Sequence, residues 1–195
     1  KKITKPKILK KIKFKKYPLL MGILNATPDS FSDGGKFLKS KYANIQIKKL
    51  KKDGADIIDI GGESTRPNSN TVNSSTEWHR IKNKLKYAKK NKFFISVDTR
   101  KSFVLKKSLA FNINLLNDVS GLSYDKKIID ILFKTKLPFV LHHMQGTPKT
   151  MQKNPKYKNV VLDIYDFFEK KLKFIRANKI THNNIILDPG IGFGK

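Results

Sequence analysis

The sequence predicts an α/β protein with the fold of a TIM (β/α)8 barrel, truncated after about six strands. Three observations support this prediction. Short apolar runs alternate with Lys-rich segments of helical length, polar side chains stand at the end of every apolar run, and the 195 residues end soon after the sixth run. Since a complete barrel of this kind needs about 250 residues, we expect the barrel to be incomplete.

The apolar runs are short and rich in branched residues, as expected for the strands of a parallel sheet that is buried on both faces. They cover residues 19–24, 56–60, 93–97, 113–116, 139–141 and 185–187. The segments that we expect to form helices cover residues 41–53, 76–91, 101–110, 125–136 and 158–178. These elements place a barrel domain at residues 19–195, after a basic N-terminal segment at residues 1–18.

Polar residues at the strand ends favour a barrel over an open doubly wound sheet. An open sheet concentrates its ligand contacts at one switch point, whereas a barrel gathers all its strand ends around one mouth. In this sequence every strand contributes a polar residue: Asn25, Asp59, Asp98, Asn117, His142 and Asp188. The expected functional site is the mouth that these strand ends surround.

The composition excludes several classes of protein. Lys and Arg number 42 against 15 Asp and Glu, but only four of the basic residues are Arg, the side chain that specific nucleic-acid recognition favours. We therefore expect no specific nucleic-acid partner. The absence of Cys excludes disulfides, thiolate zinc sites and Cys nucleophiles, and best fits a cytoplasmic enzyme. No apolar stretch approaches the roughly 18 residues of a membrane helix, so we expect no membrane partner.

Two polar loops follow the first two strands. Residues 21–35 read MGILNATPDSFSDGG, where Asn25 is suited to bind Mg²⁺ through its side-chain oxygen or to donate its amide to a phosphate; otherwise it hydrogen-bonds the turn. Residues 56–67 read DIIDIGGESTRP, where Thr65 and Arg66 are suited to contact an anionic ligand. The alternative for Arg66 is a salt bridge with Glu63 that shapes the loop.

Two carboxylates and an amide end later strands: Asp98, Asn117 and Asp188. Such a set suits general acid–base catalysis, metal binding, or recognition of a flat ring with several N–H donors, such as a pterin. The alternative for each carboxylate is to cap the following helix. The adjacent His142 and His143 are expected to be packed or hydrogen-bonded and not to bind a metal, because neighbouring strand residues point to opposite faces.

Six motifs, in this order and spacing, resemble those of the dihydropteroate synthase family of pterin-binding enzymes, the sulfonamide targets of folate biosynthesis. They read MGILNATPDSFSDGG, DIIDIGGESTRP, SVDT, NDVSG, HMQGTPKTMQ and LDPGIGFGK, and span about residues 19–195. The resemblance implies a transferase that joins (7,8-dihydropterin-6-yl)methyl diphosphate to 4-aminobenzoate, giving 7,8-dihydropteroate and diphosphate. It also implies a Mg²⁺ cofactor and a homodimer of the complete protein.

The resemblance further implies residue roles. Asn25 would bind Mg²⁺ with the leaving diphosphate, and Asp59 would support the loops that form the 4-aminobenzoate site. Asp98 and Asp188 would be catalytic by stabilising a developing cation, because a neutral arylamine needs no strong base. The substrate-binding residues it implies are Phe31, Thr65, Arg66, Pro67, Asp98, Asn117, Met144, Asp188 and Phe193.

The chain also departs from the family pattern. A Lys-Ser segment on the seventh strand and an Arg-x-His segment on the eighth complete the site in the family, and these 195 residues end before either strand. We therefore expect the 195-residue chain alone to be inactive. Two alternatives stay open: an inactive truncated remnant, and a pterin barrel like that of the methyltetrahydrofolate-binding methyltransferases.

Overall fold

The structure, a computed structural model, describes residues 18–27, 40–64, 69–147 and 150–195. Its six strands form one parallel sheet in chain order. They are β1 (Met21–Asn25), β2 (Ile57–Gly61), β3 (Phe94–Asp98), β4 (Leu115–Asp118), β5 (Phe139–His142) and β6 (Ile185–Asp188). A sheet that keeps chain order has no switch point, so the prediction of a barrel-type arrangement over a doubly wound one is confirmed.

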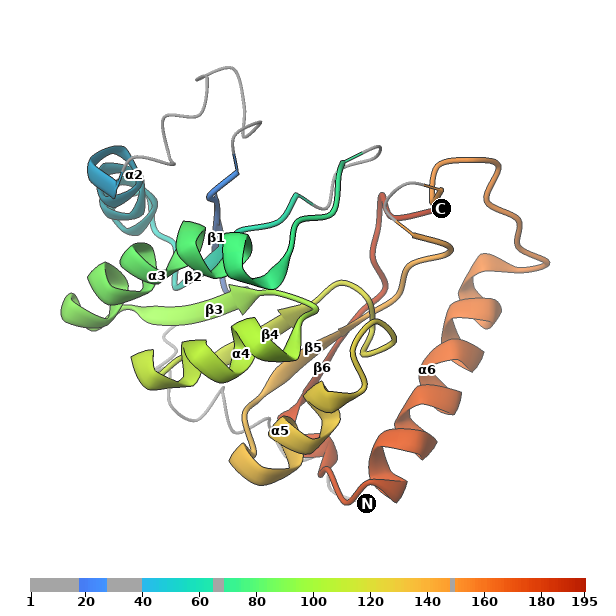
Figure 1. Ribbon diagram of the computed structural model, residues 1–195. Coiled ribbons are helices and arrows are strands. Elements are labelled where there is room, and N and C mark those ends of the chain that lie inside the picture. Colours follow the sequence, from blue (N-terminus) through green and yellow to red (C-terminus); the bar gives the residue numbers. More distant parts are fainter. Residues whose placement is uncertain (1–17, 28–39, 65–68, 148–149) are drawn as a thin grey trace.

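The connecting helices lie on one face of the curved sheet (Figure 1), as right-handed crossovers that all run in one direction require. The α-helices are α2 (Ser40–Lys52), α3 (Ser74–Lys90), α4 (Ser102–Ser108), α5 (Lys127–Thr135) and α6 (Val160–Ala177). Two short 3-10 helices, η2 (Leu109–Phe111) and η3 (His182–Asn184), precede β4 and β6. In the part of the chain that the structure describes, no helix is both long and apolar enough to cross a membrane.

The observed boundaries agree with the predicted ones to within about two residues, and the strand boundaries differ from the predicted ones in one direction. Every strand begins at or after the start of its apolar run and ends one or two residues after its end, as β1 does at Asn25. The strands thus include the polar residues at the ends of the apolar runs. The predicted basic segment at residues 1–18 lies outside the described residues, except for Pro18.

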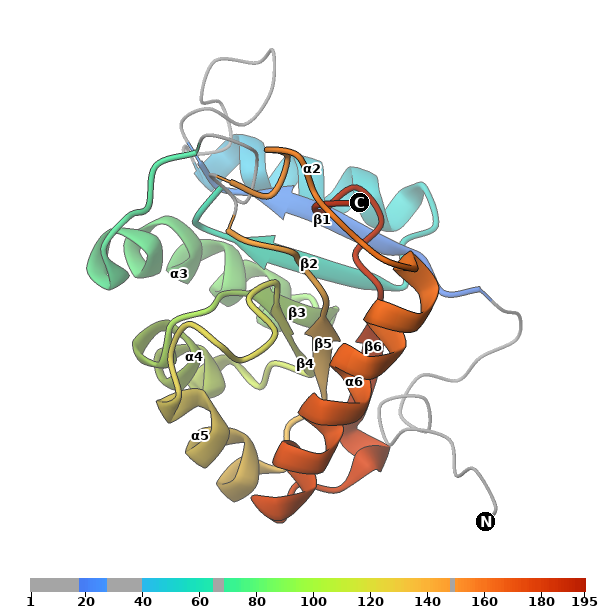
Figure 2. The ribbon, with the colours of Figure 1, turned by 90° about the vertical axis from the view of Figure 1, so that its right-hand side faces the viewer.

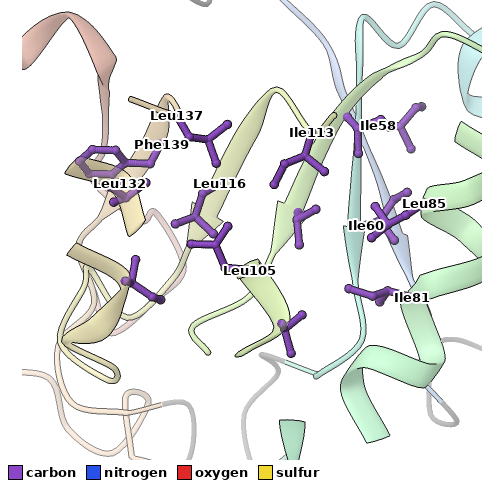
Figure 3. Close-up of a cluster of buried hydrophobic side chains, with 14 of the residues drawn as sticks. Ile58, Ile60, Ile81, Leu85, Leu105, Ile113, Leu116, Leu132, Leu137 and Phe139 are labelled. Carbon is purple, nitrogen blue, oxygen red and sulfur yellow. The ribbon is translucent and has the colours of Figure 1, made fainter. Parts of the chain in front are cut away.

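The main hydrophobic core lies between the sheet and the helices. Figure 3 shows Leu105 of α4 beside Leu116 of β4, and Phe139 of β5 near Leu132 of α5. All four side chains are at most 1% exposed. Because strand side chains alternate between the two faces, the residues between these core positions face the other side of the sheet, the inner side of the barrel.

A second, smaller apolar cluster covers part of this inner face. Leu115 and Val140 are buried there, and three half-buried side chains pack against them: Met21, Phe94 and Ile186. All five residues come from the first half of their strands. The inner face therefore has an apolar floor, and polar side chains stand nearer the carboxyl ends of the strands.

Candidate active site

The polar strand ends form a row along the carboxyl edge of the sheet, and the strand register aligns part of this row. Asn25 is level with Gly61, Gly61 with Asp98, and Asp98 with Asn117. At the other end of the sheet, Asp188 of β6 is level with His142 of β5, two residues beyond Val140, which is level with Asn117. Figure 2 shows the carboxyl ends of the strands and the loops that follow them on the same side of the molecule. The structure thus brings together the strand-end residues that the sequence singled out.

Asp59 and Asn117 form a hydrogen-bonded pair inside this row. The Asn117 Nδ2 atom donates to Asp59 Oδ2 at 2.9 Å, and the Asp59 side chain is almost fully buried. Burial raises the pKa of Asp59, and the hydrogen bond from Asn117 opposes this only in part. Asp59 therefore fixes the orientation of the Asn117 amide and leaves the amide oxygen for another donor. Its contact with Asn117 connects β2 to β4, and its expected role in supporting the loops of residues 28–39 and 65–68, which lie outside the described residues, stays a prediction.

Asp98 ends β3 beside this pair. Burial raises the pKa of Asp98 well above its usual value, and the negative charges of Asp59, Glu77, Asp118 and Glu63 raise it further. The alternative role as a helix cap does not apply to Asp98, because the N-cap position of α4 is Lys101 and makes no side-chain cap hydrogen bond. The carboxyl group is thus held where ionisation is costly, and a ligand that donates hydrogen bonds to it would relieve that cost.

Asp188 ends β6 in a more open position, with its side chain 46% exposed. Its Oδ1 atom accepts a hydrogen bond from the Gly190 amide at 2.8 Å, which shapes the glycine turn that follows. Its Oδ2 atom lies 3.9 Å from Nε2 of His142. Since Nδ1 of His142 lies 3.1 Å from the carbonyl of Val119, an acceptor, the Nδ1 atom carries a proton. Burial lowers the pKa of His142, although Asp188 opposes this, so the ring is favoured in its neutral form.

The two adjacent histidines contact different partners, as the sequence predicted. The His142 ring meets Phe193 edge-on, with ring centroids 4.6 Å apart, whereas the His143 ring packs against Phe167 of α6 at 4.7 Å. Phe193 therefore packs on the same ring that approaches Asp188, and Met144 is half-buried just beyond β5. Lys195 donates its Nζ to the carbonyls of His143, Gly190 and Phe193, so it holds the last turn together.

Four predicted site residues lie outside the described residues: Phe31, Thr65, Arg66 and Pro67. Asn25 is described and half-buried at the end of β1, beside the glycine of β2. A Cβ atom at Gly61 would come within 3.1 Å of Asp98 Oδ2. A glycine at this position therefore keeps the space between Asn25 and Asp98 free of a side chain.

A buried charged cluster behind the row was missed by the sequence analysis. The Glu63 carboxylate pairs with Arg100 Nε at 2.9 Å and with Lys101 Nζ at 3.0 Å. Glu77, in the first turn of α3, pairs with the same Lys101 Nζ at 2.5 Å and accepts a hydrogen bond from Thr99 Oγ1 at 2.5 Å. Burial raises the pKa of Glu63, but its hydrogen bonds with the two cations outweigh this and lower it overall. Glu63 thus pairs with cations that follow β3.

Comparison with known proteins identifies the family of this site. The family model described as pterin binding enzyme matches residues 21–195. The chain belongs to this family. The predicted family is therefore confirmed.

Relatives of this pterin-binding enzyme are dihydropteroate synthases. That of Haemophilus influenzae is 43% identical over 180 residues, which make up 91% of this chain and 65% of the relative. The crystal structure of the Yersinia pestis enzyme with a sulfonamide drug has a TM-score of 0.83 and 40% identity, over 91% of this chain and 65% of that one. The Clostridium difficile enzyme in the presence of pteroic acid has a TM-score of 0.82 and 37% identity, over 94% of this chain and 68% of that one. The chain thus spans about two thirds of their length.

Proposed function

We propose that the inner face of this sheet binds the pterin ring of a dihydropteroate synthase substrate, and that the whole protein condenses (7,8-dihydropterin-6-yl)methyl diphosphate with 4-aminobenzoate. The observation that carries this proposal is the Asp98 carboxyl group beside the Asp59–Asn117 pair, above an apolar floor. Turnover is proposed for the whole protein, because the chain spans 65% of the length of the H. influenzae enzyme.

The chemistry of the row matches a pterin. A flat heteroaromatic ring with N–H donors and ring acceptors along its edge needs carboxylates to accept, an amide to accept or donate, and an apolar surface beneath it. Asp98 and Asn117 supply the polar groups, and Leu115 and Val140 belong to the floor. The relatives support this assignment, because the C. difficile enzyme was crystallised in the presence of pteroic acid.

In the proposed reaction, the amine nitrogen of 4-aminobenzoate forms a bond to the methylene carbon of the pterin substrate. The bond between that carbon and the diphosphate oxygen breaks, the diphosphate leaves with the electron pair, and the nitrogen loses one proton to solvent. Positive charge develops on the pterin as the diphosphate leaves. Asp98 and Asp188 stabilise that charge electrostatically, and the neutral amine needs no general base. The ring-binding groups also hold the methylene carbon in place for attack.

Mg²⁺ fits one edge of the row. This ion commonly keeps several water ligands and takes one or two protein oxygens together with substrate phosphates. Asn25 offers such an oxygen at the end of β1, and Gly61 leaves the space beside it free of a side chain. When bound with the diphosphate, Mg²⁺ would neutralise the charge of the leaving group.

We also propose that the whole protein is a cytoplasmic homodimer.

Binding of pteroic acid, measured by calorimetry, tests the site. We expect Asp98→Ala and Asn117→Ala each to weaken binding about tenfold or more, since each removes a hydrogen-bonding partner of the ring. The control is Asp130→Ala on α5, an exposed carboxylate outside the row, which should change the affinity less than twofold. Equal binding by all variants would contradict the proposed site.

Turnover by the full-length protein tests the reaction. Release of diphosphate from the pterin substrate should require 4-aminobenzoate and give one dihydropteroate for each diphosphate. Pterin binding without turnover in the full-length protein would instead indicate a remnant. Methyl transfer from methyltetrahydrofolate would indicate the rival enzyme class.

A further inference from the structure

The three residues that follow Asp98 are all held by buried carboxylates. Thr99 donates its hydroxyl to Glu77, Arg100 donates its Nε to Glu63, and Lys101 pairs with both. Glu77 is fully buried and Glu63 nearly so. The chain therefore leaves β3 through a set of contacts that come from two other elements, the end of β2 and the first turn of α3.

The cluster is tied to the rest of the site by backbone contacts. The Thr99 amide donates to the carbonyl of Asn117 at 3.1 Å, which joins the exits of β3 and β4. Arg80 of α3 donates to the carbonyl of Gly62 at 2.9 Å. A Cβ atom at Gly62 would come within 2.7 Å of the Glu77 carbonyl, so α3 packs directly against the end of β2. The carboxyl ends of β2, β3 and β4 and the first turn of α3 thus meet at this cluster.

From these contacts we propose that Glu63 and Glu77 are positioning residues for Asp98, acting through the three residues that follow it. This inference rests on the proposed function, because it assumes that Asp98 binds the pterin ring. Through their contacts with Thr99, Arg100 and Lys101, the two carboxylates fix the backbone that follows Asp98. A buried network with all its members paired is rigid, and a ligand-binding group on a rigid support loses less freedom when the ligand binds.

The contact between Thr99 and Glu77 offers the sharpest test. Thr99→Val keeps the shape of the side chain and removes the hydroxyl, and Thr99→Ser keeps the hydroxyl. The matched control is Thr135→Val on α5, where an exposed hydroxyl donates to the Ile131 carbonyl at 2.7 Å, remote from the cluster. A second variant, Glu63→Gln, removes the charge that pairs with Arg100 and Lys101.

Two measurements on the full-length protein decide the inference. The first is amide hydrogen exchange of residues 98–101 without ligand, and the second is the affinity for pteroic acid. We expect Thr99→Val and Glu63→Gln to speed exchange at residues 98–101 and to weaken binding about tenfold, the loss typical when a supporting contact of a binding group is removed. Thr99→Ser should restore the affinity to within threefold of the original, and Thr135→Val should change neither quantity.

The outcomes separate this inference from the proposed function. Unchanged exchange at residues 98–101 in both Thr99→Val and Glu63→Gln would overturn the inference, whatever the activity. Faster exchange with unchanged affinity would also overturn it, because the contacts would then hold the backbone without positioning Asp98. If the original protein does not bind pteroic acid, the proposed function fails, while the exchange data still decide whether the two carboxylates hold the exit of β3.

Discussion

The region of β2, β3, β4, α3 and α4 differs from the region of β5, β6 and α6 in how completely its side chains are buried. All five residues of β2 are buried, but only Ile185 is buried in β6. Helix α3 buries five residues, including Glu77, whereas α6 buries two, Phe168 and Ile175. Several large apolar side chains of α6 are exposed instead, as for Leu162 at 60%.

The site residues of the two regions also differ in the partners that hold them. In the first region, partners from other elements fix them: Asn117 is held by Asp59, and the exit behind Asp98 is held by Glu63 and Glu77. In the second region, Asp188 is held mainly by the amide of its own turn. The groups of the first region that we propose to face the pterin are thus held in place by other parts of the protein without a ligand, and such preorganisation lowers the cost of binding.

Removing a paired lysine should give the largest difference between the two regions in the free energy of unfolding that is lost. Lys101→Met leaves Glu77 and Glu63 without a shared partner in a buried setting, and loss of one member of such a network typically costs about 3–5 kcal/mol. Lys173→Met in α6 breaks an exposed pair with Glu169 and should cost less than about 1 kcal/mol. Unfolding of the 195-residue chain in urea measures both. Similar losses would mean that the cluster does not stabilise the first region.

Removing apolar volume should give the next largest difference. Leu116→Ala opens a cavity at a position with no solvent exposure, and such changes cost about 2–5 kcal/mol. Leu162→Ala changes a side chain that is 60% exposed and should cost less than about 0.5 kcal/mol. The free energy of unfolding of each variant checks this. A large loss for Leu162→Ala would show that the chain in solution covers this face of α6.

The sequence predicted the order and direction of the elements because the apolar runs, helical segments and polar strand ends repeat with one pattern. It also predicted the row of Asn25, Asp98, Asn117 and Asp188, since the carboxyl ends of parallel strands share one edge. These features depend on local pattern. They can be read without knowing which residues meet across the fold.

The charged cluster could not be predicted in this way, because its partners are far apart in sequence. Glu77 lies 24 residues before Lys101, and it has the appearance of a solvated carboxylate in a first helical turn. The arginine nearest to Glu63 in the sequence is Arg66, which lies outside the described residues. The arginine that pairs with Glu63 among the described residues is Arg100, 37 residues away. The pairing depends on how closely α3 packs on the end of β2, which the glycine at position 62 permits. A single sequence carries no signal for that distance.

The smallest expected difference concerns the folding stability that the buried carboxyl group of Asp98 costs. The raised pKa of Asp98 means that the folded protein holds its proton more tightly than the unfolded chain does, so stability falls as the pH rises above the usual carboxyl value of 3.8. Asp98→Asn removes this cost and should raise the free energy of unfolding at pH 7 by about 0.5–2 kcal/mol, although it weakens pteroic acid binding. Asp188→Asn, in the more open region, should change stability by less than about 0.5 kcal/mol.

Unfolding measured from pH 3 to pH 8 checks the sign of this effect. The stability gained by Asp98→Asn should be present at neutral pH and should shrink as the pH falls toward the usual carboxyl pKa, where the original Asp98 is itself neutral in both states. A gain that persists at pH 3 would point to packing as its cause, and a loss of stability at pH 7 would contradict the assignment of a strained, functional carboxylate. The stabilised variant that binds pteroic acid poorly would show that the first region gives up stability to hold Asp98 for its ligand.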